Sequence, residues 1–302
     1  MVEKYQKVLN HSLKGVAILF ALFAFYQFYS HSPWEKVSIQ SPYFLVLACF
    51  LMPLNWLLES KRWQILLRPL FNVSLLRALL GVLSGLGASF LAGKTVGSAL
   101  GRYWAIPKTV DRNQSIGALF VSQLTQGIHT FWIGIPCTMW FLRNHIIQLQ
   151  HENLLIGGLI LGGTIFFFFL KKLYRNKIVI NFLQRYFLLL KEYTLKLLIA
   201  TLTLGFVRYG VFTIQFVCVI HAIDTSISFQ LLFFVVPVIF LIKTISPNLG
   251  GFLDLGIREL STLYIFEYFS LDPNTALVSA LMIWGINILF PSLIGLGIRW
   301  KL

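Results

Sequence analysis

Long apolar runs recur along this chain, and they constrain its fold more than any other feature. The runs are Leu13–Tyr29, Tyr43–Leu58, Ile116–Leu142, Leu154–Leu170, Leu197–Ile220, Leu231–Ile242 and Thr275–Ile298. Most are long enough to cross a bilayer as helices, which satisfy their own backbone hydrogen bonds there. Only 12% of the residues are charged, about half the share of a soluble domain. The sequence therefore predicts an all-α, polytopic integral membrane helical bundle, with residues 1–302 in a single transmembrane domain.

The net charge of +14 is distributed as in a membrane protein. Lysine and arginine crowd the stretch Lys171–Lys196, and others follow the second apolar run at Lys61, Arg62, Arg68 and Arg77. Membrane proteins concentrate such residues in cytoplasmic segments. We expect Lys171–Lys196 to lie along the anionic cytoplasmic leaflet as an amphipathic segment, or to be a solvated loop. No nucleic-acid partner is expected.

Small residues recur at every fourth position between Leu79 and Arg102. They are Gly81, Gly85, Ser89, Gly93, Gly97 and Gly101. At helical spacing they form one smooth ridge on which another helix can pack closely. The apolar part, Leu79–Ala92, is only about 21 Å long as a helix, too short for a hydrocarbon core of roughly 30 Å. Short, glycine-broken segments of this kind point to binding sites in transporters.

Counting crossings from the basic segments places both termini in the cytoplasm. Residues 78–102 then start and end on the same side, which predicts a re-entrant hairpin. Residues 221–273 leave and re-enter the outer side, as two crossings or as a second hairpin. The chain would have about six full spans plus two glycine-broken re-entrant hairpins, or about seven to eight spans. Two hairpins would give inverted halves, 1–150 and 151–302.

Four stretches resemble a known family. They are Leu57–Leu67 (LLESKRWQILL), Gly93–Arg102 (GKTVGSALGR), Ser246–Glu259 (SPNLGGFLDLGIRE) and Leu281–Gly297. The chain resembles the transmembrane region of lysylphosphatidylglycerol synthases, a flippase-like family of bacterial and archaeal membrane proteins. In the first glycine segment the family has a proline before the glycine and an acidic residue after it. Gly93 and Ser98 occupy those places here.

The resemblance implies movement of a lipid or lipid-linked headgroup between the leaflets of the cell membrane, the bacterial inner membrane. The synthase domain that gives the family its name is not in this sequence, so aminoacyl transfer is not expected. The implied re-entrant segments carry Gly93, Gly97, Gly101, Gly250 and Gly251.

Arg208 lies about twelve residues into an apolar run, near the bilayer midplane if that run spans. An arginine there is costly and must face protein or water. It could hold a lipid phosphate in bidentate fashion, with Gln215 on the same helical face. The alternative is a structural ion pair, with Asp254, Glu259 or Glu267 as the partner.

Arg258 and Glu259 adjoin the second glycine segment, and Asp254 lies one helical turn before Arg258. Asp254 and Arg258 could pair at i and i+4. One of the acidic side chains could instead load a proton or cation that drives transport.

Two further candidates come from the amino-terminal half. Arg102 ends the first glycine segment, where it would bind a headgroup or extend to the membrane interface. Gln126 belongs to a polar stripe that either packs between helices or lines a hydrophilic groove. The stripe consists of Ser122, Gln123, Gln126, His129 and Thr130.

The sequence has no spacing typical of a catalytic or metal site, so no enzyme activity, metal or cofactor is expected. The favoured hypothesis is a transporter of a membrane lipid with an anionic headgroup. The alternative is a non-transporting membrane subunit that packs against an enzyme of lipid or envelope synthesis. A homo-oligomer is compatible with both.

Overall fold

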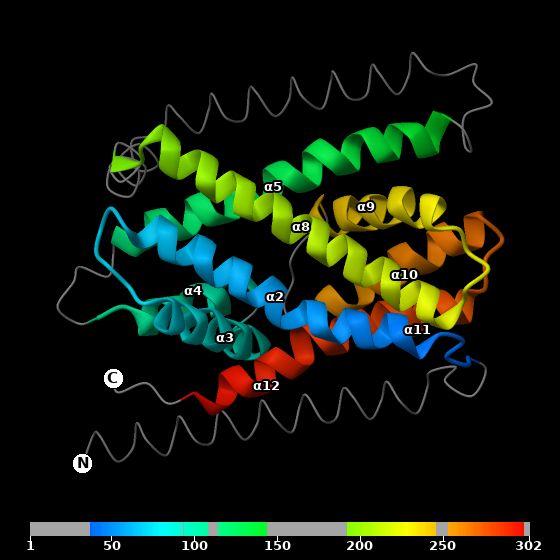
Figure 1. The fold of residues 1–302 in the computed structure, drawn as a ribbon, viewed down its shortest axis with the longest axis horizontal. Helices are drawn as coiled ribbons and strands as arrows, with labels where there is room; N and C mark the ends of the chain where they lie inside the picture. Colours follow the sequence, from blue (N-terminus) through cyan, green and yellow to red (C-terminus); the bar gives the residue numbers. More distant parts are fainter. Residues whose placement is uncertain (1–36, 93, 108–113, 144–191, 246–252, 299–302) are drawn as a thin grey trace.

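The protein is all-helical throughout the residues that the computed structural model describes, which are 37–92, 94–107, 114–143, 192–245 and 253–298. This confirms the predicted polytopic helical membrane fold (Figure 1). The apolar runs Leu13–Tyr29 and Leu154–Leu170, and nearly all of Lys171–Lys196, lie outside the described residues. The elements are α2 (Pro42–Leu67), α3 (Leu75–Ala92), α4 (Lys94–Ala105), α5 (Gln114–Phe141), α8 (Leu195–Ile223), α9 (Phe229–Ile245), α10 (Leu253–Tyr268), α11 (Pro273–Trp284), η4 (Gly285–Leu289) and α12 (Phe290–Gly297).

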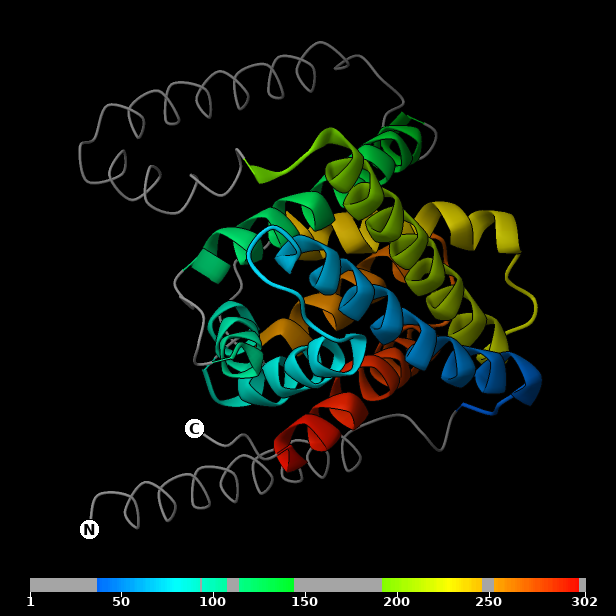
Figure 2. The same cartoon turned by 60° about the vertical axis from the view of Figure 1, so that its left-hand side comes forward.

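Three described stretches are long and apolar enough to cross a membrane: α2, α8 and Pro273–Gly297. α2 and α8 pack against each other along the middle of the molecule (Figures 1 and 2). Gln215 of α8 links the two helices, since its side-chain amide donates a 2.6 Å hydrogen bond to the carbonyl of Ala48 in α2. Large apolar side chains such as Phe50 and Trp132 remain exposed. In a membrane this apolar exterior faces lipid rather than water.

The segment predicted to form a hairpin folds as α3 and α4, which pack side by side (Figure 2). Its re-entrant placement in the membrane stays a prediction. The ridge of small residues does not serve a separate helix, because the chain turns back after Ala92 and the two halves of the ridge face each other. Gly101 lies against the backbone of Gly85, and Gly97 lies against that of Ser89. At these two positions a Cβ atom would collide with backbone, so only glycine permits this approach.

The hairpin is also joined to the last helix. Gly87 of α3 lies against Leu296 of α12, and Gly295 of α12 lies against the backbone of Leu83. α9, from the second half of the chain, packs on α5, from the first half. Whether α9 and α10 form a second re-entrant hairpin or two crossings stays a prediction.

The last apolar run is not one regular helix. α11 begins at an Asp272 cap, whose carboxylate accepts hydrogen bonds from the backbone N–H groups of Asn274 and Thr275 at 3.2 and 2.9 Å. The run then passes through the π-helical turn η4 before α12. Asn287 in this turn accepts a buried 3.2 Å hydrogen bond from Asn55 of α2. π-Helical turns are local irregularities that frequently occur at functional sites.

We expect Gly101→Ala to destabilise the fold by about 1–3 kcal/mol, because the added methyl group forces α4 away from α3. Gly210→Ala is the matched control, since a Cβ at Gly210 in α8 meets no atom within 4 Å. Thermal unfolding of both purified variants in detergent measures the difference. Equal melting temperatures would show that the hairpin does not depend on this contact.

We expect Asp272→Ala to lower stability by about 1 kcal/mol near neutral pH, through loss of the helix cap. Burial opposes ionisation of Asp272, but the hydrogen bonds from Thr275 and Asn274 outweigh it and hold its pKa below the usual value. The stabilisation is therefore present above the unfolded-state pKa and is lost as the pH falls through the folded-state pKa. The gap in melting temperature between the wild type and the variant should narrow below about pH 4. A gap that is constant with pH would contradict this assignment.

Candidate functional site

A single carboxylate, that of Glu59, lies inside the bundle among three guanidinium groups. Glu59 is only 2% exposed. Its side-chain oxygens lie 2.7 Å from Arg62, 2.5 Å from Arg102 and 3.3 Å from Arg208. These arginines belong to α2, α4 and α8, so one carboxylate connects three helices.

The cluster carries excess positive charge. Burying a carboxylate or a guanidinium is expensive unless it is paired, and Glu59 offers one negative charge to three positive ones. Hydroxyl groups of α5 take part of the remaining hydrogen-bonding capacity. Arg62 donates to Ser122 at 3.1 Å and to Thr125 at 3.4 Å.

Two tryptophans of α2 support the arginines. The guanidinium carbon of Arg102 lies 5.0 Å from the centre of the Trp63 ring, and that of Arg208 lies 5.5 Å from the centre of the Trp56 ring. At these distances a cation is attracted to an aromatic face. The stretch Leu57–Leu67 therefore supplies the carboxylate, one arginine and one of these two rings.

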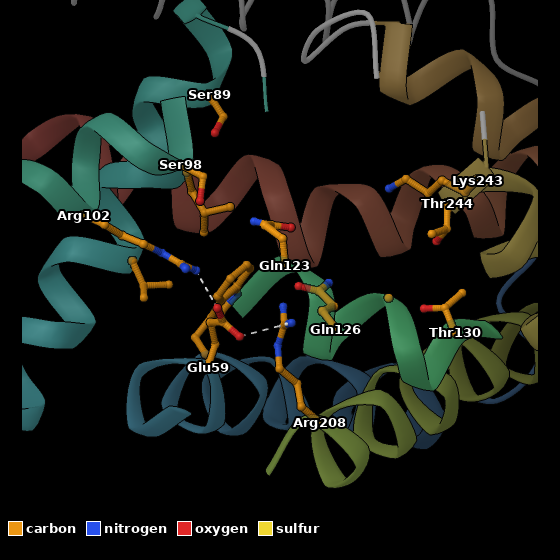
Figure 3. Close-up of a pocket in the computed structure, with 14 residues that line it drawn as sticks. Glu59, Ser89, Ser98, Arg102, Gln123, Gln126, Thr130, Arg208, Lys243 and Thr244 are labelled. Atoms are coloured by element: carbon orange, nitrogen blue, oxygen red, sulfur yellow. Dashed lines mark hydrogen bonds and ion pairs between the residues drawn. The ribbon is translucent and has the colours of Figure 1, made fainter. Parts of the chain in front are cut away.

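A cavity of about 200 Å³ adjoins the cluster. Figure 3 shows Arg102, Glu59 and Arg208 at one end, Lys243 and Thr244 at the other, and Gln123 and Gln126 between them. The lining residues are Trp56, Glu59, Val82, Leu86, Ser89, Ser98, Arg102, Gln123, Gln126, Gly127, Thr130, Arg208, Lys243 and Thr244. They come from both halves of the chain.

The structure brings some predicted site residues together and leaves others apart. Arg102, Arg208 and Gln126 line the cavity. Gln215 does not, because it is fully buried against α2. Arg258 is fully buried in α10, and neither it nor the neighbouring Glu259 belongs to the cavity lining.

The remaining predicted residues are glycines and Asp254. Gly97 and Gly101 form the contact between α3 and α4. Gly93, Gly250 and Gly251, and the side chain of Asp254, lie outside what the structure describes.

Two sequence predictions were wrong. Arg208 pairs with Glu59, which is not among the partners expected from the sequence. Arg62 was assigned to a basic cytoplasmic segment that starts after Leu58, but α2 continues to Leu67 and buries Arg62 completely. The cost of burying its charge is offset by Glu59 one turn earlier in the same helix.

Glu59 itself was missed. The available signal was its i, i+3 spacing to Arg62 at the end of an apolar run. That spacing is a helical pairing rule, and it also fits an exposed surface pair. The pairing of Glu59 with the two arginines that are distant in sequence has no sequence signal.

The cluster is suited to binding anions. Guanidinium groups present paired N–H donors that match carboxylate and phosphate oxygens. Among the described residues, no group of histidine, cysteine, aspartate and glutamate side chains could hold a metal ion. The guanidinium and amide groups of this site can recognise an anion by charge and hydrogen bonding.

The fold and the site together define a polytopic helical membrane protein with a cationic internal cavity. The family model described as the lysylphosphatidylglycerol synthase TM region matches residues 13–295. The chain belongs to this family, as its sequence motifs predict. No curated protein and no solved structure matches the chain.

We expect Glu59→Gln to destabilise the protein by roughly 3–5 kcal/mol, because Arg62, Arg102 and Arg208 would lose their counter-ion. Glu267→Gln is the control, since Glu267 is an exposed carboxylate on α10. Thermal unfolding in detergent compares the two variants. If Glu59→Gln and the control have the same melting temperature, the carboxylate does not hold the three helices together.

Proposed function

We propose that this protein binds the anionic headgroup of a lipid or lipid-linked molecule in the cavity and moves it between membrane leaflets. The observation that carries the proposal is the placement of Arg208. Its side chain is 17% exposed and lines the cavity, whereas the Glu59 side chain beside it is 2% exposed. A headgroup can thus reach the cation without first displacing the buried carboxylate.

The charge of the cavity supports the same proposal. A phosphate between Arg102 and Arg208 would be bound by groups from α4 and α8, which belong to opposite halves of the chain. Binding between two halves is the arrangement that lets transporters expose one site to either side in turn. Membership of a flippase-like membrane family agrees with this role. We propose that the protein lies in the bacterial inner membrane with both termini cytoplasmic, the orientation that its basic segments favour.

We expect Arg208→Gln to lower the rate of lipid translocation by about tenfold or more, since a charged hydrogen-bond donor to the headgroup is lost. The measurement is dithionite quenching of a fluorescent phosphatidylglycerol in proteoliposomes that contain the purified full chain. Arg143→Gln is the matched control, because Arg143 is exposed and lies outside the cavity. Melting temperatures of both variants confirm that they are folded.

Full translocation by Arg208→Gln would overturn the assignment of this residue. If the wild type itself moves no lipid above protein-free vesicles, the transport proposal fails. A membrane subunit that packs against an enzyme of lipid or envelope synthesis, or a homo-oligomeric scaffold, is then the better description.

A further inference from the structure

The electrostatics of the cavity discriminate between headgroups. Among the described residues that line it, Arg102, Arg208 and Lys243 are cationic and Glu59 is the one carboxylate. The fully buried Arg62 pairs with Glu59 and adds a further positive charge beside the cavity lining. In a partly enclosed site, where charges are screened less than in bulk water, such an excess repels an ammonium group and attracts a phosphate.

The wall between the two cationic ends is neutral but rich in hydrogen-bonding groups. Gln123, Gln126 and Thr130 lie along one face of α5, and in Figure 3 both glutamine amides lie between the arginine end and Lys243. The carbonyl oxygen of Gln126 lies 3.5 Å from Arg62, which leaves its NH₂ group for another acceptor. Gln123 makes no hydrogen bond to the rest of the described chain.

Such amides fit a particular ligand chemistry. Each amide both donates and accepts, and so does a hydroxyl group. Phosphate oxygens at neutral pH mainly accept, and an ammonium group only donates. A ligand that carries both a phosphate and hydroxyl groups would therefore match the arginines and the glutamines at once.

We propose that the cavity selects headgroups that combine a phosphodiester with free hydroxyls, as in a glycerol or sugar phosphate, over headgroups that end in an ammonium. The inference rests on the proposed function, since it assumes that the headgroup enters this cavity. The phosphate lies at the arginine end, and the hydroxyls face Gln123 and Gln126. Gln123 is the specificity-determining residue.

The size of the cavity agrees with a headgroup as the occupant. Its volume of about 200 Å³ is below the roughly 300–1,000 Å³ of pockets that enclose whole drug-sized ligands. The acyl chains must therefore stay outside, and the headgroup alone is recognised.

The test is native mass spectrometry of the full chain in detergent, titrated with phosphatidylglycerol, phosphatidic acid and phosphatidylethanolamine of equal chain length. We expect phosphatidylethanolamine to bind most weakly. Gln123→Met keeps the length of the side chain but removes its amide, and should reduce the preference for phosphatidylglycerol over phosphatidic acid by about three- to tenfold. Arg208→Gln should weaken both anionic lipids together. The affinity for phosphatidic acid is the folding control: if Gln123→Met keeps this affinity, the variant is folded at the site.

An unchanged preference in Gln123→Met, or phosphatidylethanolamine binding as tightly as phosphatidylglycerol, would overturn the inference. Either result leaves the transport proposal intact if Arg208→Gln still slows translocation in proteoliposomes. Conversely, selective binding by a wild type that moves no lipid would support the headgroup selectivity and reject transport.

Discussion

The ion-pair cluster around Glu59 is the interaction on which the rest of this structure depends. An unpaired carboxylate or guanidinium inside a membrane bundle is too costly to persist, so α2, α4 and α8 must meet where their charges can combine. Because three arginines share one carboxylate, the pairing cannot neutralise the site. The cluster therefore holds the helices together and also leaves the positive charge that makes the adjoining cavity attractive to an anion.

The packing of the α3–α4 hairpin also positions one arginine of this cluster. Arg102 directly follows Gly101, whose contact with Gly85 brings α4 against α3. A side chain at Gly101 would displace α4 and move Arg102 away from Glu59. The charge pairing of Arg102 therefore depends on the backbone packing of the hairpin, because the two residues involved are adjacent in the sequence.

Much of the fold was predictable from periodicity and charge. Apolar runs predicted the helices, and the distribution of basic residues predicted that residues 78–102 form a hairpin. The site was only partly predictable. Arg208 stands out in an apolar run through the cost of burying it, but its partner Glu59 lies 149 positions earlier, and no local pattern records that contact. Arg258 adjoins the second glycine segment, yet its position in α10 keeps it out of the cavity lining.

The contact between α3 and α12 has a mechanical consequence. Where Gly87 and Gly295 bring two backbones together, no side chain lies between them that could change rotamer and let one helix slide past the other. The hairpin and α12 must then travel as a single block whenever the bundle rearranges. The irregular turn η4 adjoins that block at its junction with α11, and Asn287 within it is hydrogen-bonded to α2 one helical turn from Glu59. Bending at this turn would change the position of the block relative to the charge cluster.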